Sequence, residues 1–135
     1  MKRVSPVFWR LTITLVSLLL AFIVSGTVFA QSALPGDMFY NWKLGSENAW
    51  RMVSPDRLGT DLSLSNRRVN ELVALSGDEM RRARALEDYQ RLLIRFQSAN
   101  NEQDQARILL VLQAQREILN RAGVYIPELD TFLSP

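Results

Sequence analysis

The stretch from Ser32 to Lys43, Ser-Ala-Leu-Pro-Gly-Asp-Met-Phe-Tyr-Asn-Trp-Lys, separates two segments of different character in a chain of 135 residues. An uncharged apolar run precedes it, and amphipathic sequence with helical spacing follows it. Proline and glycine predict a turn at Leu34-Pro35-Gly36-Asp37, and the Asp37 carboxylate can cap a helix that starts there. We therefore expect an all-α fold, in which an N-terminal hydrophobic helix is followed by a small helical bundle.

Residues 11–30 carry no charge, and as a helix they would span about 30 Å, the thickness of a bilayer's hydrocarbon core. Two interpretations stay open. The segment is a secretory signal cleaved after Ala30, because Val28 and Ala30 are small residues at the positions that a signal peptidase inspects, or it is a retained transmembrane anchor. The basic residues before it predict that the chain beyond Ala30 is extracytoplasmic, at the cell envelope.

Start and stop signals divide the rest of the chain into about four helices. A first short helix follows Asp37, with a possible bend at Gly45-Ser46. Ser54 is predicted to cap the second helix, with proline at its first position, and that helix runs to about Ser76. Gly77 is its expected stop.

Asp78 is predicted to cap a third helix, which covers about Glu79 to Ser98. The fourth covers about Glu102 to Ala122 and ends at Gly123. The short loop between these two helices predicts an antiparallel helical hairpin. We thus expect a signal or anchor at residues 1–30, an extracytoplasmic helical domain at 31–123 and a tail at 124–135.

Apolar residues at helical spacing identify the faces expected to form the core. In the first short helix they include Phe39, Trp42 and Trp50, and packing of these aromatics in the core is favoured over a pocket or a membrane-interface position. In the tail, residues that can fold back onto the bundle are Tyr125, Ile126, Leu129 and Phe132. The other expected core positions are Leu58, Leu62, Val69, Leu72, Val73, Ala83, Leu86, Tyr89, Leu93, Phe96, Ile108, Val111, Leu112, Ile118 and Leu119.

The composition excludes several classes of chemistry. The chain has neither cysteine nor histidine, which removes Ser-His and Cys-His catalysis and histidine- or cysteine-bound metals. Three of its 16 basic residues precede the apolar run, and the remaining 13 face 14 acids, a balance that does not favour nucleic-acid binding. No phosphate-binding loop or nucleotide fingerprint occurs. We therefore predict no enzyme, no catalytic residue, no cofactor, no metal and no small-molecule substrate.

Charged clusters are interpreted as structural. The acidic pairs, which begin at Asp78, Glu87 and Glu102, lie at helix starts or beside arginines, and Arg81-Arg82-Ala83-Arg84 is expected on a solvated surface. Expected ion pairs are Arg67 with Glu71, Arg84 with Asp88, and Glu87 with Arg91. Arg68 is predicted to turn inward against Glu71 and the first short helix as a clamp, because a guanidinium suits buried polar junctions.

Several of these elements together resemble a bacterial family known only as a domain of unknown function. They are the Leu-Pro-Gly-Asp-x-x-Tyr-x-x-Lys opening behind a membrane segment, then Ser54-Pro55, then an Arg-Arg-x-x-Glu element. The resemblance covers about Ala33 to Ala122, including Gln115-Arg116-Glu117-Ile118-Leu119, and its opening is its most specific part. The family-signature positions carried over, all given a structural role, are Leu34, Pro35, Gly36, Asp37, Tyr40, Lys43, Arg67, Arg68 and Glu71.

The resemblance implies an extracytoplasmic helical module that works through an unknown protein partner. Some members are joined to a cytoplasmic anti-sigma domain, but only ten residues precede the apolar run here, too few for such a domain. Asp61 stands near a place where many members carry a histidine. The alternatives are a small single-span accessory subunit of a membrane complex, or the outer module of an anti-sigma-type system without its cytoplasmic domain.

Overall fold

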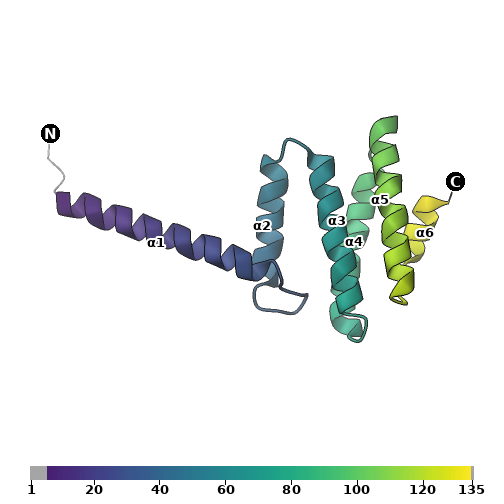
Figure 1. Cartoon of the computed structure of the whole chain (residues 1–135), viewed down its shortest axis with the longest axis horizontal. Helices are drawn as coiled ribbons and strands as arrows, with labels where there is room; N and C mark the ends of the chain where they lie inside the picture. Colours follow the sequence, from purple (N-terminus) through teal and green to yellow (C-terminus); the bar gives the residue numbers. More distant parts are fainter. Residues whose placement is uncertain (1–5, 135) are drawn as a thin grey trace.

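The chain forms an apolar N-terminal helix followed by a helical bundle (Figure 1). The computed structural model describes residues 6–134, so Lys2 and Arg3 of the basic leader lie outside the described residues. The described part is all-helical, as the sequence predicts. Its helices are α1 (Pro6–Ala30), α2 (Tyr40–Val53), α3 (Arg57–Ala74), α4 (Glu79–Phe96), α5 (Glu102–Arg121) and α6 (Pro127–Leu133).

Helix α1 projects away from the bundle, and the helices of the bundle run across its direction (Figure 1). Within α1, Trp9–Ala30 is long and apolar enough to cross a membrane, and only 6% of its most apolar window is buried in the protein. The end of α1 meets α2, where Gly26 lies beside the Trp42 ring and the Trp42 indole N–H donates to Thr27 Oγ1 at 3.5 Å. Ala30 is fully buried at this junction.

Helix α3 is the centre of the bundle, because it packs against α2, α4 and α5. Successive helices from α2 to α5 alternate in direction, so α4 and α5 form the predicted antiparallel hairpin around the loop 97–101 (Figure 1). Most of the predicted core positions of α3, α4 and α5 are buried or half-buried, but Ile118 of α5 is 45% exposed. Ala83 of α4 is exposed too, because the inward side of that helix runs through Ala85 and Tyr89. The buried apolar residues include Leu62, Val69, Leu72, Tyr89, Leu93, Phe96, Ile108, Leu112 and Leu119.

Helix ends of α3, α4 and α5 follow the cap signals with two corrections, both in α3. Asp78 accepts from the Arg81 N–H, and Gly123, with a φ of +71°, follows the end of α5, both as expected. Asp56, and not Ser54, caps α3, because its carboxylate reaches the Gly59 N–H at 2.8 Å. Helix α3 ends at Ala74 with Leu75 as its C-cap, before the expected stop at Gly77.

The core prediction for α2 is wrong. Helix α2 continues through Gly45-Ser46 and buries Tyr40, Lys43 and Glu47, whereas Trp42 and Trp50 are 43% and 42% exposed. The aromatic spacing is helical, but it marks the outward side of the helix. The charged side chains point inward because α3 supplies a matching charge for each of them, as described below.

The tail is part of the bundle. Helix α6 packs against α4 and α5, and it places Ile126 and Leu129 in the core with Phe132 packed beside them. Tyr125 does not fold back, since it is 69% exposed. The tail thus covers the end of the core that α4 and α5 leave open.

Candidate functional site

Four ionised side chains from α2 and α3 meet in the interior. Lys43 and Glu47 lie one turn apart on α2, and Arg68 and Glu71 lie three residues apart on α3. Each is at least 95% buried. Lys43 Nζ donates to Glu71, Arg68 donates to both Glu71 carboxylate oxygens at 2.5 Å, and Arg68 also bonds to Glu47.

The four side chains, which we call the buried ion cluster, balance one another with two positive and two negative charges. Tyr40 packs beside them, with Lys43 Nζ 5.9 Å and the Arg68 guanidinium carbon 5.8 Å from its ring centre. These distances suit cation–π contact, which favours a desolvated cation. The predicted clamp is confirmed: Arg68 reaches inward to Glu71 on its own helix and to Glu47 on α2.

Burial changes the protonation preferences within the cluster. Desolvation raises the pKa of Glu47 above its usual value, against the opposing effect of Arg68 and Lys43. Burial alone would lower the pKa of Arg68, but the carboxylates of Glu71 and Glu47 outweigh it and raise that pKa. The cluster therefore holds Arg68 charged in the interior, and each charge depends on its neighbours.

Residues 33–37, which we call the signature turn, are held by hydrogen bonds from α2 and from α4. Lys43 Nζ donates to the Ala33 carbonyl at 2.9 Å, and Arg81 of α4 donates to the Pro35 carbonyl and to Asp37. Asp37 is not the predicted cap of α2; its carboxylate accepts from the Leu34 N–H at 2.7 Å and so closes the turn. The opening motif thus joins the end of α1 to both α2 and α4.

The turn requires glycine at position 36. Gly36 has a φ of +96°, in the left-handed region that residues with a Cβ rarely occupy. A Cβ at this position would also lie 3.0 Å from Arg81 Nε. Arg81, expected on a solvated surface, instead packs over this glycine and holds the turn.

Tyr40 links the cluster to α4. Its hydroxyl donates to Asp88 Oδ2 at 2.7 Å, and burial, followed by the hydrogen bond to Asp88, raises the Tyr40 pKa well above its usual value. Asp88 also pairs with Arg91 at 3.1 Å, where the sequence predicts Arg84 as its partner. The expected pair of Glu87 and Arg91 is present at 2.5 Å. Tyr40 therefore stays a neutral hydrogen-bond donor.

The structure brings nearly all of the signature positions together around the cluster. Pro35, Tyr40, Lys43, Arg68 and Glu71 are buried, Leu34 is half-buried, and Gly36 and Asp37 lie at the surface of the turn. Arg67 differs from its prediction: it pairs with Glu47 at 3.4 Å instead of Glu71, and its guanidinium stacks 5.6 Å from the Trp50 ring. Arg67 thus closes the cluster on the side of α1.

Sequence reasoning missed Glu47, and it assigned Asp88 an ion pair on its own helix without foreseeing its contact with Tyr40. Glu47 stands four residues after Lys43 on the same helix face, and this spacing could have pointed to it once Lys43 was known to be buried. For Asp61 the sequence indicates only a place near which many members of the resembled family carry a histidine. It accepts from Arg51 Nε at 2.6 Å and lies 3.5 Å from Arg95, so its carboxylate is matched by two arginines.

A second polar group lies deeper in the bundle. Tyr89 on α4 donates to Gln115 Oε1 at 2.8 Å, and Gln115 Nε2 donates to Ser65 Oγ and Asn66 Oδ1, each at 2.7 Å. Gln115 and Ser65 are fully buried, and burial raises the pKa of Tyr89. Ser65 interrupts the apolar stripe of α3 because it is needed as this partner.

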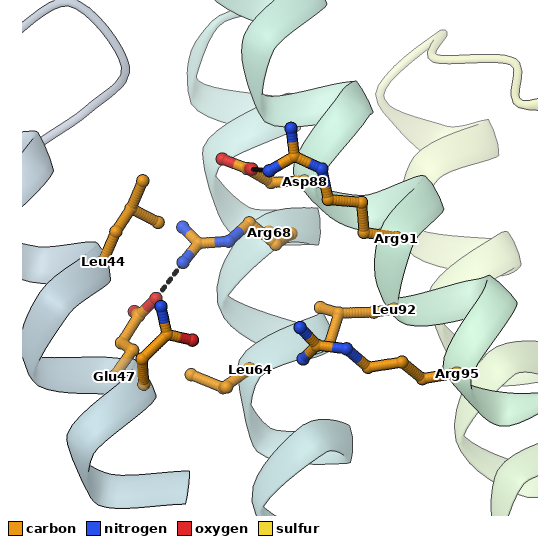
Figure 2. Close-up of a pocket in the computed structure, with 9 residues that line it drawn as sticks. Leu44, Glu47, Leu64, Arg68, Asp88, Arg91, Leu92 and Arg95 are labelled. Atoms are coloured by element: carbon orange, nitrogen blue, oxygen red, sulfur yellow. Dashed lines mark hydrogen bonds and ion pairs between the residues drawn. The ribbon is translucent and has the colours of Figure 1, made fainter.

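A small cavity opens beside the buried ion cluster. It has a volume of about 120 Å³, with Glu47 and Leu44 on its α2 side and Arg68 on its α3 side. Figure 2 shows Asp88, Arg91 and Arg95 reaching toward it from α4. Each carboxylate at the cavity faces a guanidinium, and no group of three acidic side chains that could hold a metal occurs within residues 6–134. The arrangement can hold helices together and admit water.

Comparison with known proteins finds no match for this chain among family models, curated proteins or solved structures. The resemblance of the Leu-Pro-Gly-Asp opening to a family of unknown function therefore stays a prediction.

Proposed function

We propose that the chain is a non-enzymatic interaction module of the cell envelope, anchored by a retained α1, with its bundle on the extracytoplasmic side. The observation that carries the proposal is the junction between α1 and the bundle. Ala30 is fully buried, and the Ala33 carbonyl accepts from the buried Lys43 ammonium. A membrane segment built into the domain in this way serves as an anchor better than as a disposable signal.

Retention of α1 is also supported by the geometry at the possible cleavage site. Helix α1 continues to Ala30, and the next residues turn directly into the signature turn, with Ala33 buried. A cut after Ala30 would separate two halves of one packed junction. Orientation rests on the basic residues Lys2, Arg3 and Arg10, which favour the inner side of a membrane.

The proposed role in binding a protein partner is supported by the positions of the charged and apolar side chains. The charged residues of the buried ion cluster bond to one another across α2 and α3, so their chemistry serves helix packing. Beside the exposed ion pair of Glu117 and Arg121, in contrast, the outer side of α5 exposes two large apolar side chains, Leu110 and Ile118, at 72% and 45% exposure. These two lie eight residues apart on one face of the helix, and they are the surface we assign to a protein partner.

The test has two parts. Mass spectrometry of the native protein should find the sequence from residue 1 in the membrane fraction, resistant to alkaline extraction; a mature chain that starts at Gln31 contradicts the anchor. A photo-crosslinking residue at Leu110 or Ile118 should join the protein to a specific envelope partner in intact cells. The same residue at Glu87, on the exposed side of α4, is the control, and equal patterns from all positions contradict the assignment to α5.

A further inference from the structure

Helix α2 has an inverted polarity. The charged residues in its 14-residue sequence are Lys43, Glu47 and Arg51, and each faces α3. Lys43 pairs with Glu71, Glu47 with Arg68, and Arg51 with Asp61. A surface helix of a soluble protein normally carries its charges on the outward side.

The outward side of α2 is uncharged over the whole of the helix, which the structure describes completely. Met52 and Val53 are 71% and 80% exposed, and Met38, just before the helix, is 85% exposed. The outward side, which we call the α2 outer face, consists of Asn41, Trp42, Gly45, Ala49, Met52 and Val53. Trp50 lies at one edge of it, against Arg67, and Asn48 lies at the other edge, where it lines the cavity beside the buried ion cluster. Exposed positions of α4 and α5 differ, since they include ion pairs such as Glu87 with Arg91 and Glu117 with Arg121.

The position of α1 indicates what covers this face. In Figure 1, α2 is the bundle helix nearest α1, and α1 projects on the side of α2 that is turned away from α3. The apolar span ends at Ala30, and Trp42 touches the last turns of α1 through Gly26 and Thr27. When α1 spans a bilayer, the surface of that bilayer therefore lies at the level of α2.

We infer that the α2 outer face lies in the headgroup region of the bilayer that holds α1, so that lipid is its partner. The inference rests on the retained anchor of the proposed function. Tryptophan is favoured at membrane interfaces, and the Asn41 amide can bond to headgroups while Met52 and Val53 meet the acyl boundary. Because the face carries no cation, its binding depends on apolar contact and not on anionic lipid.

The test uses the full chain in phosphatidylcholine vesicles and fluorescence quenching by lipids with a quencher near the headgroup. The chain has three tryptophans, so Trp9→Phe with Trp50→Phe leaves Trp42 as the sole fluorophore. We expect lipid quenchers to abolish much of the Trp42 emission, with the loss unchanged at high salt. A variant with all three tryptophans replaced by Phe and with Leu110→Trp on α5 is the matched control, and it should respond to aqueous iodide instead.

Two further variants keep the outcomes separate. Met52→Trp in the tryptophan-free background tests a second position of the α2 outer face, ten residues after Trp42 and away from its contact with α1. A chain with Trp9 alone reports on α1. If Trp42 and Met52→Trp respond to iodide as Leu110→Trp does, the α2 outer face does not lie in lipid, and protein or water covers it instead. Lipid quenching of Trp9 in the same experiment would still support the anchor. Trp9 without lipid quenching contradicts the anchor itself.

Discussion

At the scale of single residues, the buried ion cluster shows how a small bundle can specify the pairing of two helices. Apolar contacts between α2 and α3 would tolerate several registers, but Lys43, Glu47, Arg68 and Glu71 satisfy one another in one arrangement. Removing one partner of a buried ion pair leaves an uncompensated charge in the interior. Replacing both partners with apolar residues avoids that penalty.

Arg68→Leu should lower the free energy of unfolding by about 3 to 5 kcal/mol, since it leaves the buried Glu47 carboxylate with only the longer contact to Arg67 at 3.4 Å. The double variant Arg68→Leu with Glu47→Leu should recover most of the loss, because Lys43 and Glu71 remain paired. Thermal unfolding of the full chain in detergent, followed by circular dichroism, measures both. An unchanged melting temperature for Arg68→Leu would show that the clamp does not stabilise the fold.

Two glycines provide a pair of substitutions with opposite expected signs. Gly36→Ala should destabilise by about 1 to 3 kcal/mol, since φ is +96° and the new Cβ would crowd Arg81. Gly45→Ala should stabilise by about 0.5 to 1 kcal/mol, because Gly45 lies inside α2 with no atom near the position of a Cβ. Melting temperatures that move in the same direction for both variants contradict this account of the turn.

At the scale of helices, polar contacts set the relation of α3 to its neighbours. Gln115 joins α5 to α4 through its Oε1, which accepts from Tyr89, and to α3 through its Nε2, which donates to Ser65 and Asn66. Asp56 both caps α3 and accepts from Arg107 of α5 at 3.1 Å. These contacts explain why α5 packs on α3 in a single register.

Gln115→Leu should cost about 1 to 3 kcal/mol, because it leaves the Tyr89 hydroxyl and Ser65 without their buried partner. Gln113→Leu makes the same change two residues away at an exposed position of α5 and should stay within about 0.5 kcal/mol of the parent chain. Chemical denaturation in detergent compares the two. Equal losses would assign the effect to helix propensity in α5 rather than to the buried amide.

The start of α3 should respond to acid. The Gly59 N–H, then Arg107, lower the pKa of Asp56, so the ionised carboxylate stabilises the fold above its usual pKa and this contribution is lost as the pH falls through the lowered value. Asp56→Asn keeps a cap but removes the charge. The difference in melting temperature between parent and variant should be largest at neutral pH and should close below about pH 4. A difference that is constant with pH contradicts the role of the charge.

At the scale of the whole molecule, the sequence predicted the all-α class, most of the helix ends and the core of α3 to α5. These follow from caps and apolar spacing, which are local signals. The inner side of α2 was missed because its contacts are charged, and the spacing of Phe39, Trp42 and Trp50 indicated the opposite face. A buried lysine is unfavourable on its own, so its position follows only from the carboxylate that α3 provides.

The orientation of the molecule can be tested with cysteine, which the natural sequence lacks. A membrane-impermeant maleimide should label Arg121→Cys at the exposed end of α5 in intact cells, and it should label Lys2→Cys only after the cells are opened. Basic residues before the apolar segment favour this result. The reverse pattern would place the bundle in the cytoplasm.

With α1 as the proposed membrane anchor, the transverse packing of the bundle against α1 limits how far the protein reaches from the bilayer. Packed helix axes lie about 8 to 10 Å apart, and α5 packs on α3, which in turn packs on α2, so α5 stands only about 20 Å beyond α2. The signature turn leaves no free linker that could extend this height. A partner that docks on Leu110 and Ile118 must then itself approach the membrane closely, which favours a neighbour held in the same bilayer.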